Sequence, residues 1–392
     1  MNKQRKNQLI DLCVRMIQTP SVTGKEKDLI ELLRREMSLL GFDEVQTDSV
    51  GNIIGKISGS GSGKTILFDG HLDTVSIANR KSWTKEPFGA EISEGKIFGR
   101  GSSDMKGALA AMIIAAVEVK ESGRTAGDIY VSGTVFEEIA EGYALESVIK
   151  KISPDIVIIG EATELNLNIG QRGRAEIVIN TYGVPAHSSN PEIGVNAVYH
   201  MLKLIDEIRK IPEPSCPYLG SGNLVLTDII SSPFPGASVI PEACTATFDR
   251  RLLTGETIEL VLKPIQEIID KLYTEDTTFK AQVDIAAMNV STYTKHIGRH
   301  TRFAPAWLLD REDDLVHSAL DAIHSIGLED AALGTYSFCT NGSCSAGVLG
   351  IPTLGFGPSR ENQAHTIDEY IVIEELEKAC KGYMALAKAL AV

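Results

Sequence analysis

Short apolar segments typical of β-strands alternate with helical segments between residues 67 and 161, and this alternation constrains the fold most strongly. The strand-like runs end near His71, Phe136 and Gly160, and a long apolar helical run occupies residues 105–119. Strands that alternate with helices indicate a mostly parallel sheet with helices on both faces. The sequence therefore predicts an α/β domain built on such a sheet.

Metal-binding side chains lie where the first of these strands ends. His71 and Asp73 are two residues apart, so their side chains point the same way in an extended chain. His71 can therefore coordinate a metal while Asp73 holds its ring in one tautomer. Taken alone, the pair also fits a turn with a capping aspartate and an incidental histidine, because short motifs often occur by chance.

Four further segments repeat this pattern at distant places in the chain. Each carries an acid or a histidine just beyond an apolar strand or at a helix start: Asp104, Glu137, Glu138, Glu161 and His365. Open α/β sheets bind their ligands at these strand ends. A single carboxylate there is most often a solvated loop residue. Two histidines with three carboxylates, however, are enough to hold a pair of zinc-class ions that share a bridging group.

Length and charge narrow the possible functions. The chain has 392 residues, of which 43% are hydrophobic, so two domains with well-formed cores are expected. A net charge of −14 argues against nucleic acid or an anionic membrane as the main partner. No long apolar run follows the basic N-terminus, and the longest apolar stretch, residues 108–117, is too short to span a bilayer. With six scattered cysteines that lack paired spacing, we expect a cytoplasmic protein with free thiols.

The N-terminal region predicts two amphipathic helices. The first covers residues 6–18, and Thr23-Gly24-Lys25-Glu26 reads as a capping box for a second that stops near Gly41. Gly63-Lys64-Thr65 imitates the end of a phosphate-binding loop, but a strand rather than a helix follows. We therefore do not expect nucleotide binding there.

A second pattern begins after residue 172. Segments expected to form strand, helix, strand, strand, helix and strand occupy residues 174–181, 192–210, 224–230, 244–251, 257–273 and 280–286. That order is typical of a split ferredoxin-like α+β unit. We expect residues 173–292 to form this inserted domain and residues 1–172 and 293–392 to form the α/β domain.

The candidate residues lie in motifs that resemble one family. The motifs are His71-Leu72-Asp73, Gly99-Arg100-Gly101-Ser102-Ser103-Asp104-Met105-Lys106-Gly107, Glu137-Glu138, Gly160-Glu161-Ala162-Thr163, Gly183-Val184-Pro185-Ala186-His187-Ser188-Ser189 and Ala364-His365. Over essentially its whole length the chain resembles the co-catalytic zinc aminoacylases and exopeptidases. This group includes acetylornithine deacetylase, succinyl-diaminopimelate desuccinylase and bacterial glutamate carboxypeptidase.

The resemblance implies a two-metal centre in the α/β domain. Asp104 would bridge two zinc ions, with cobalt or manganese as alternatives. His71 and Glu161 would complete one site, and Glu138 and His365 the other. The family often holds the peptide after the bridging aspartate in the cis form, which we expect at Asp104-Met105.

The resemblance also implies catalytic and substrate-binding roles. Glu137 would be the general base that takes a proton from metal-bound water, and Asp73 would support the histidine two residues before it. His187, which alone would pass for a surface or capping residue, would stabilise the oxyanion in the partner subunit's active site, implying a homodimer through the inserted lid domain. Arg251 would clamp a substrate carboxylate, and Asn341 would lie beside the substrate.

The expected activity is hydrolysis of the amide bond of an N-acyl amino acid or of a small peptide with a free carboxylate. A dipeptidase or carboxypeptidase of the same chemistry, a non-catalytic binding relative and a di-metal phosphoesterase are the alternatives. Ser238, Ala162 and the loop at residues 340–343 depart from the pattern of many relatives. The specificity of no single relative is therefore carried over.

Overall fold

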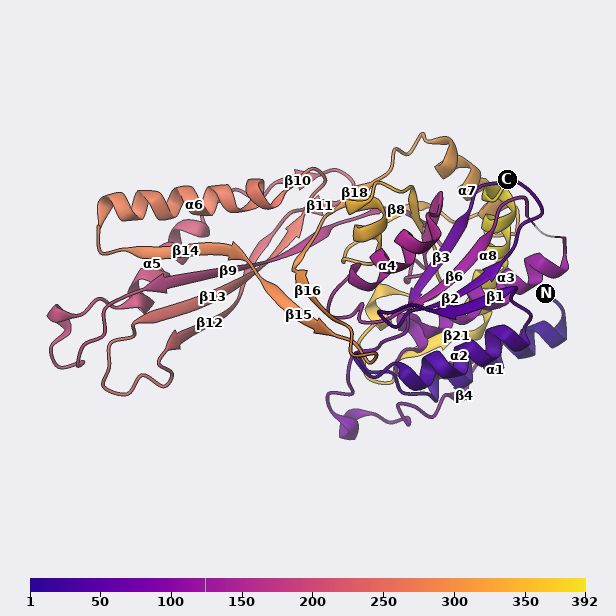
Figure 1. The fold of residues 1–392 in the computed structure, drawn as a ribbon, viewed down its shortest axis with the longest axis horizontal. Coiled ribbons are helices and arrows are strands. Elements are labelled where there is room, and N and C mark those ends of the chain that lie inside the picture. The colour runs from indigo at the N-terminus through magenta and orange to yellow at the C-terminus, as the bar shows by residue number, and fades with distance from the viewer. Residues whose placement is uncertain (124) are drawn as a thin grey trace. The chain divides into compact units, whose positions relative to one another are not determined.

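The computed structural model describes residues 1–123 and 125–392, which form two compact units (Figure 1). Unit 1 comprises Met1–Gln171, Asn289–Gly298 and Trp307–Val392, and unit 2 comprises Arg172–Met288 and Arg299–Ala306. Unit 2 thus takes in a second short segment beyond the predicted insertion. The reason is that β17 (Phe303–Ala304) pairs with β9 (Gly173–Tyr182), the first strand of unit 2.

Unit 1 is built on a mixed sheet, nine-stranded among the described residues. Its spatial order is β1 (Glu44–Thr47), β2 (Ile53–Ile57), β6 (Ile129–Thr134), β3 (Ile66–His71), β7 (Ile156–Ile159), β20 (Thr353–Gly355), β8 (Leu167–Gln171) and β18 (Trp307–Leu308), with β19 (Leu333–Tyr336) beside β8. The four central strands β6, β3, β7 and β20 are parallel, whereas β1, β2 and β18 pair antiparallel. The α/β prediction is confirmed, with a parallel centre and partly antiparallel flanks.

Helices cover both faces of this sheet. One face packs against α3 (Gly107–Glu121) and the other against α4 (Tyr143–Ile152). The alternation within β3 serves both layers, since Leu67 joins the cluster under α4 while the Phe68 ring meets Tyr383 edge-on at 5.5 Å. Tyr383 belongs to α8 (Ile373–Leu390), which lies beside α3.

The N-terminal helices are α1 (Lys3–Ile17) and α2 (Lys27–Leu39). The predicted capping box is wrong, because no side chain caps α2. Glu26 is fully buried and accepts a hydrogen bond from the Gly24 backbone N–H at 2.8 Å, while the Thr23 hydroxyl donates to Asp73 at 2.8 Å. Both polar side chains therefore bind within the interior instead of the helix end.

Smaller elements complete unit 1. Strands β4 (Glu91–Ser93), β5 (Lys96–Phe98) and β21 (Tyr370–Val372) form a separate three-stranded sheet, and α7 (Asp314–His324) packs beside α8. Across the described residues, no helix combines the length and apolar character needed to cross a bilayer.

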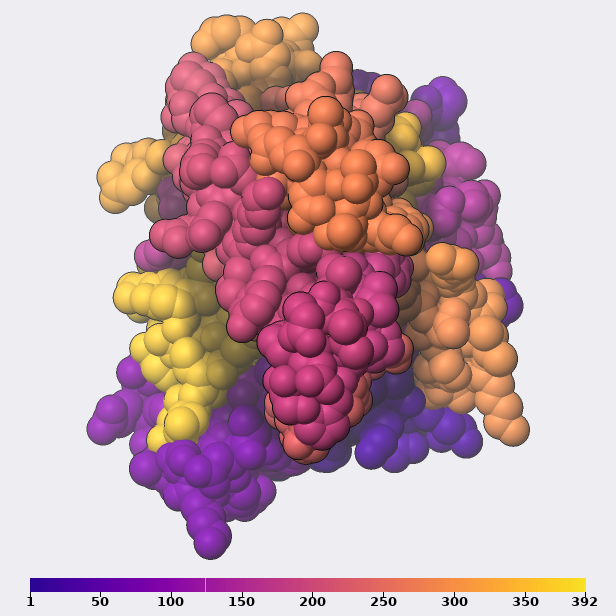
Figure 2. Space-filling view, turned by 90° about the vertical axis from the view of Figure 1, so that its left-hand side faces the viewer, coloured from indigo at the N-terminus to yellow at the C-terminus, as the bar shows by residue number. Residues whose placement is uncertain are grey.

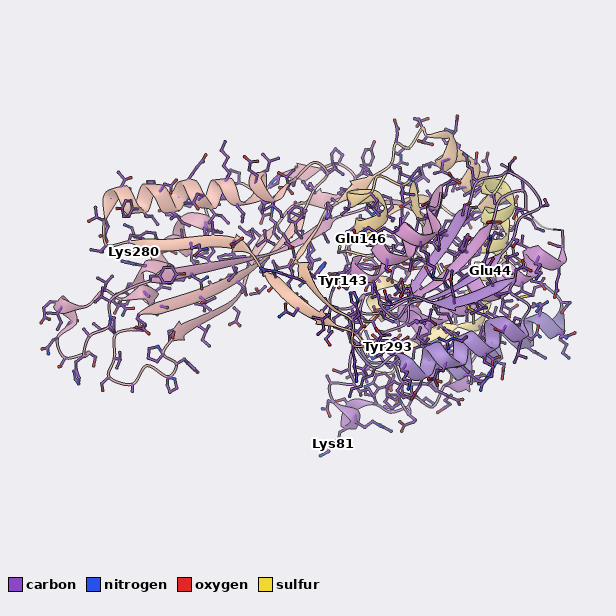
Figure 3. The ribbon with its side chains drawn as sticks, in the orientation of Figure 1. Glu44, Lys81, Tyr143, Glu146, Lys280 and Tyr293 are labelled. Carbon is purple, nitrogen blue, oxygen red and sulfur yellow. The ribbon has the colours of Figure 1, made fainter. Side chains whose placement is uncertain are left out.

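A hairpin made of β15 (Ala287–Ser291) and β16 (Ile297–Thr301) has its turn in unit 1. The Tyr293 hydroxyl donates to the Gly51 carbonyl at 3.0 Å, and the Tyr143 hydroxyl lies 2.9 Å from His296 Nε2. Tyr143 and Tyr293 are labelled in Figure 3. These contacts fix the turn to the loop before β2 and to the first residue of α4.

Unit 2 is a ferredoxin-like α+β unit, as predicted. Its sheet order is β12 (Leu224–Ser232), β13 (Ala243–Leu252), β9 and β14 (Lys280–Ile285), all antiparallel. Helices α5 (Ala197–Ile208) and α6 (Ile258–Glu275) supply the other half of its core. Every second residue of β13 is buried, so one face of the sheet packs on the helices. The short strands β10 (Ser215–Cys216) and β11 (Gly220–Ser221) pair outside this sheet.

Candidate metal centre

The five predicted ligands lie together in unit 1. His71 ends β3, Glu138 follows β6 and Glu161 follows β7, and these three strands are parallel neighbours whose carboxyl ends meet at one edge. Asp104 comes from the turn Ser102–Lys106 before α3, and His365 from the loop after a 3₁₀ turn at Glu361–Gln363. The arrangement follows the rule that open α/β sheets place ligands beyond their strand ends.

The Asp104 carboxylate lies between the two histidine rings. Its Oδ1 is 2.9 Å from His71 Nε2, and its Oδ2 is 3.2 Å from His365 Nε2. Glu161 Oε1 lies 3.4 Å from His71 Nε2, and Glu138 Oε2 lies 2.9 Å from His365 Nε2. Each histidine therefore shares Asp104 with the other and has a glutamate of its own.

The orientation of the His71 ring is fixed by the backbone of Asp73. Nδ1 lies 2.8 Å from the Asp73 carbonyl oxygen, which can only accept a hydrogen bond, so Nδ1 donates and Nε2 faces Asp104. The Asp73 carboxylate, which we expected to hold the ring, lies 3.8 Å from Nδ1. It accepts instead from the backbone N–H groups of Glu137 at 3.0 Å and Glu138 at 3.2 Å. Asp73 thus also positions the glutamate pair.

Buried acids set the electrostatics of the cluster. Hydrogen bonds to Asp104 and Glu138 raise the pKa of His365 to about 10. Burial opposes protonation of His71, but its hydrogen bonds to Asp104 and Glu161 raise its pKa well above the usual range. Burial raises the pKa of Glu161 to about 7. An excess of carboxylates over cationic groups in a buried place favours a divalent cation, whose binding releases the histidine protons.

Glu137 lies beside the predicted ligands, and one of its carboxylate oxygens has no hydrogen-bond partner among the described residues. It is 7% exposed, and its Oε1 makes no hydrogen bond with any described residue. Burial, with the nearby Glu161, raises its pKa well above that of an ordinary glutamate. Ligand atoms of His71, Asp104 and Glu138, and of His71, Glu137 and Glu161, lie within 4.8 Å of one another. The donor set and the unpartnered oxygen therefore fit a pair of metal ions with a free acid beside them.

The peptide Asp104-Met105 is cis.

Two predicted site residues, His187 and Arg251, lie in unit 2. His187 is exposed, and its Nδ1 accepts a hydrogen bond from the Ser189 backbone N–H at 3.1 Å. Arg251 Nε lies 3.0 Å from Asp249 Oδ1. Arg250 is buried and contacts Glu256, so the two arginines point to opposite faces of β13.

Asn341 makes three hydrogen bonds inside unit 1. Its amide nitrogen donates to Asp69 at 2.8 Å and to Thr134 at 2.9 Å, and its oxygen accepts from the Gly142 backbone N–H at 2.7 Å. The residue is 4% exposed. These contacts favour a structural role for Asn341 over the substrate contact that we expected.

Sequence reasoning missed one group that binds the ligand-bearing loop. Glu369 is fully buried and accepts hydrogen bonds from the backbone N–H groups of Ser103 and Asp104. The only signal was an acid directly before a short strand, four residues after His365. Nothing in that pattern distinguishes it from a solvated turn.

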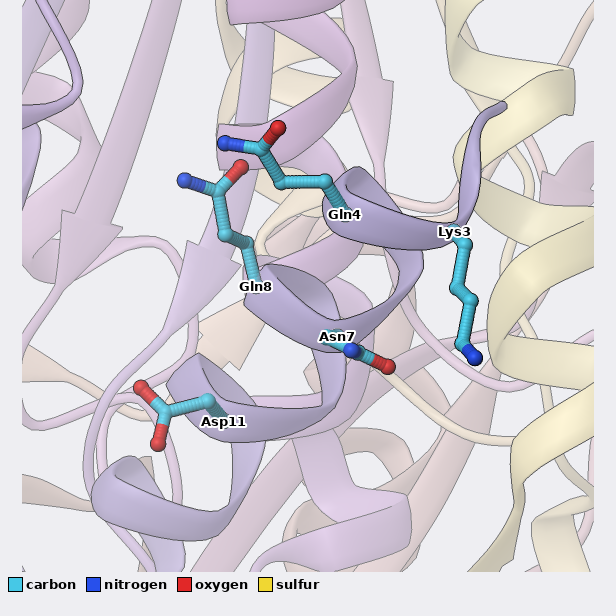
Figure 4. Close-up of a pocket in the computed structure, with 5 residues that line it drawn as sticks. All are labelled: Lys3, Gln4, Asn7, Gln8 and Asp11. Atoms are coloured by element: carbon cyan, nitrogen blue, oxygen red, sulfur yellow. The ribbon is translucent and has the colours of Figure 1, made fainter.

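Three hollows among the described residues lie away from the cluster. One of about 560 Å³ lies on the outer face of α1 and is lined by Lys3, Gln4, Asn7, Gln8 and Asp11 (Figure 4). A second, of about 440 Å³, lies in unit 2 between the end of α5, α6 and Arg250. A third, of about 480 Å³, lies in unit 1 between the end of α7 and α8. None of the three is lined by a predicted ligand.

Comparison with known proteins places the chain in a family. Residues 67–389 match the model of peptidase family M20/M25/M40. The chain is 31% identical over 378 residues to the uncharacterized protein YgeY of Escherichia coli K12, covering 95% of this chain and 91% of that one. It is 28% identical over 279 residues to succinyl-diaminopimelate desuccinylase 2 of a Ruegeria species, covering 67% and 70%.

Solved structures share the fold over the whole length. Aminopeptidase PepT of Bacillus cereus superposes with a TM-score of 0.78 at 22% identity, covering 99% of each chain. YXEP of Bacillus subtilis, described as a dinuclear metal-binding peptidase, gives a TM-score of 0.73 at 13% identity, covering 100% of this chain and 99% of that one. The chain therefore belongs to peptidase family M20/M25/M40 and is, by that membership, a hydrolase of amide bonds.

Proposed function

We propose that the protein is a two-metal amidohydrolase that cleaves the amide bond of an N-acyl amino acid or of a small peptide with a free carboxylate. One observation carries this proposal: Asp104 faces His71 and His365 through separate oxygens, while Glu137 Oε1 lies beside the set and makes no hydrogen bond with any described residue. A shared carboxylate with a histidine and a glutamate on each side suits two zinc ions, or cobalt or manganese in their place.

The ligands would be His71 and Glu161 on one side, Glu138 and His365 on the other, and Asp104 between them. Bound there, the metal ions would polarise the scissile carbonyl and lower the pKa of the attacking water. Glu137 takes the proton from that water and delivers it to the leaving amine. Burial, which raises the pKa of Glu137, suits this role because the carboxylate must hold a proton between the two transfers.

The substrate class rests on the relatives and on two residues of unit 2. A desuccinylase among the relatives supports an acyl amino acid, and an aminopeptidase among the structural neighbours keeps a small peptide as the second candidate. Arg251 is proposed to bind the substrate carboxylate and His187 the oxyanion. A panel of N-acyl amino acids and dipeptides on the metal-loaded protein separates the two candidates, since cleavage of dipeptides alone would remove the deacylase reading.

A homodimer through unit 2 is part of the proposal. The edge strand β12 exposes apolar side chains along its length: Val225 (49%), Leu226 (40%), Ile229 (41%) and Ile230 (51%). A long apolar edge strand that stays exposed is a template for pairing with another chain. Figure 2 shows one face of unit 2, whose residues have the pink to orange colours of the bar. The cytoplasm is the proposed compartment, which suits six free cysteines.

The variant Glu137→Gln tests the assignment. It keeps the size of the side chain but removes its basicity, so kcat should fall by about 10²- to 10⁴-fold. Elemental analysis should still find the wild-type metal content. Glu146→Gln, a half-buried acid nine residues further on that pairs with Lys150 on α4, is the matched control and should keep near wild-type turnover. Retained activity in Glu137→Gln would refute the general-base role, and cleavage of phosphate esters by the wild type would favour a phosphoesterase.

A further inference from the structure

Two loops that carry metal ligands are joined by a buried ion pair outside the ligand set. Glu369 accepts four hydrogen bonds with its two carboxylate oxygens. They come from Arg100 Nη1 at 2.6 Å, Gly101 N at 3.1 Å, Ser103 N at 2.8 Å and Asp104 N at 3.1 Å. Three of the four donors are backbone groups of the turn that presents Asp104. One carboxylate therefore holds that turn in place.

Arg100 connects the same carboxylate to the second loop. Its Nη2 donates to the Thr366 carbonyl at 3.2 Å, directly after His365, and its guanidinium lies 5.2 Å from the centre of the Trp83 ring. Arg100 is 4% exposed. A planar guanidinium can bind two acceptors at a fixed angle, which a lysine ammonium does not reproduce. The arginine thus fixes the His365 loop relative to the Asp104 turn.

We propose that Arg100 and Glu369 are a positioning pair that sets the separation of Asp104 from His365, and with it the second metal position. Asp104 Oδ2 lies 3.2 Å from His365 Nε2, so a small shift of either loop changes which atoms meet there. A buried ion pair is in itself weak evidence for stabilisation, because removing two charges from water offsets their attraction. Its contacts with two ligand loops provide another reason for its presence. This inference rests on the proposed two-metal function.

Metal titration of the metal-free protein tests the pair. Glu369→Gln keeps the shape but offers one oxygen, and it sets amide hydrogens against backbone N–H donors. Arg100→Lys keeps the charge but loses the planar guanidinium that binds two acceptors at once. Glu118→Gln is the matched control, since Glu118 Oε1 accepts from the largely buried Arg5 at 2.6 Å and joins α3 to α1. Calorimetric titration with Co²⁺, the visible spectrum of the cobalt-loaded protein and thermal melting are measured for each.

The wild type should bind two Co²⁺ ions. In Glu369→Gln the weaker site should lose about 10- to 100-fold in affinity and the cobalt spectrum should change, because residues that orient ligands tune metal sites by that much. Arg100→Lys should likewise weaken Co²⁺ binding at the weaker site and change the cobalt spectrum. Glu118→Gln should melt earlier yet bind both ions as the wild type does.

Binding of both ions by Glu369→Gln within threefold of the wild type, with an unchanged spectrum, would overturn the positioning role. If circular dichroism shows that Glu369→Gln does not fold, Arg100→Lys decides by the same criterion. A wild type that binds fewer than two ions would instead overturn the proposed function and this inference with it. The two failures are therefore distinguishable.

Discussion

The two units differ in whether their acidic side chains are buried. Among its described residues, unit 1 buries Glu26, Glu36, Asp69, Asp73, Glu137, Glu161 and Glu369, and all but Glu26 and Glu36 are predicted ligands or lie within a few residues of one. Among its described residues, unit 2 buries no acid, and its apolar side chains come to the surface along β12. Burying an unpaired carboxylate costs free energy, whereas exposing an apolar edge invites association. Unit 1 thus gathers most of its buried acids around the candidate metal ligands, whereas unit 2 exposes apolar side chains at a sheet edge.

The largest expected effect concerns the exposed apolar strand β12 of unit 2. Replacing both Ile229 and Ile230 by Asp should raise the dissociation constant of the proposed dimer at least 100-fold, because charges disfavour pairing at a sheet edge. Sedimentation equilibrium measures it. Leu260→Asp on α6, which changes an equally exposed apolar residue off this edge, is the control. A double variant that stays dimeric would remove β12 from the interface.

The next effect concerns Asp73, a buried acid outside the proposed ligand set. Asp73→Asn leaves one oxygen for three donors, the backbone N–H groups of Glu137 and Glu138 and the Thr23 hydroxyl. Since a misplaced glutamate pair slows proton transfer, kcat should fall about 10- to 100-fold with the metal content retained. Steady-state kinetics and elemental analysis check this. Wild-type kcat would show that these contacts serve the fold alone.

A third effect follows from the buried Glu26. Burial, with the charge of Asp73, raises its pKa to about 7 from an ordinary value of 4.5. The folded protein then holds this proton in a range where the unfolded chain has lost it, so stability falls as pH rises from about 4.5 to 7. Glu26→Gln should remove the contribution of Glu26 to this fall, and above pH 7 it should be more stable than the wild type by about 3 kcal/mol.

Urea unfolding of the metal-free proteins at pH 5 and pH 8 measures this difference. Removal of metal is needed because acid also releases metal from histidine ligands. The two proteins should be close in stability at pH 5 and diverge at pH 8. Parallel pH profiles would show that Glu26 does not titrate in this range.

The smallest expected effect lies on the surface of unit 2. Lys203 and Glu275 form an ion pair at 3.5 Å, and each side chain is about half exposed. Exposed pairs contribute little because water and salt screen them. Lys203→Ala should therefore change the free energy of unfolding by less than about 0.5 kcal/mol. A loss several times larger would contradict the view that surface charges of unit 2 are energetically minor.

The sequence was most informative where function depends on strand ends. Parallel strands bring their carboxyl ends to one edge, so His71, Glu138 and Glu161 could be placed together from three apolar runs alone. The inserted unit was equally readable, because the order of its strands and helices is specific to one topology. Both inferences use the periodic spacing of apolar residues, which is visible in the sequence itself.

Hydrogen bonds between groups far apart in the sequence could not be predicted in this way. Thr23 and Glu26 have the spacing of a capping box, yet Thr23 binds Asp73 fifty positions away. Glu369 binds backbone groups more than 260 positions earlier. Such hydrogen bonds depend on the tertiary position of the partner group, and for Glu369 the partners are backbone N–H groups, which nearly every residue type supplies. The pattern of residue types therefore carries no record of them.

Helix α3 has consequences for synthesis as well as for the folded state. All but three of its residues are buried, so it has no solvent-facing side of its own and depends on α1, the sheet and α8 for cover. Helix α8 begins about 250 residues after α3 ends. At about 5–20 residues per second, a ribosome needs roughly 10–50 s to make that stretch. During that time the apolar surface of α3 that α8 will cover stays exposed on the nascent chain. The yield of folded protein in the cell should therefore depend on chaperones that bind this segment.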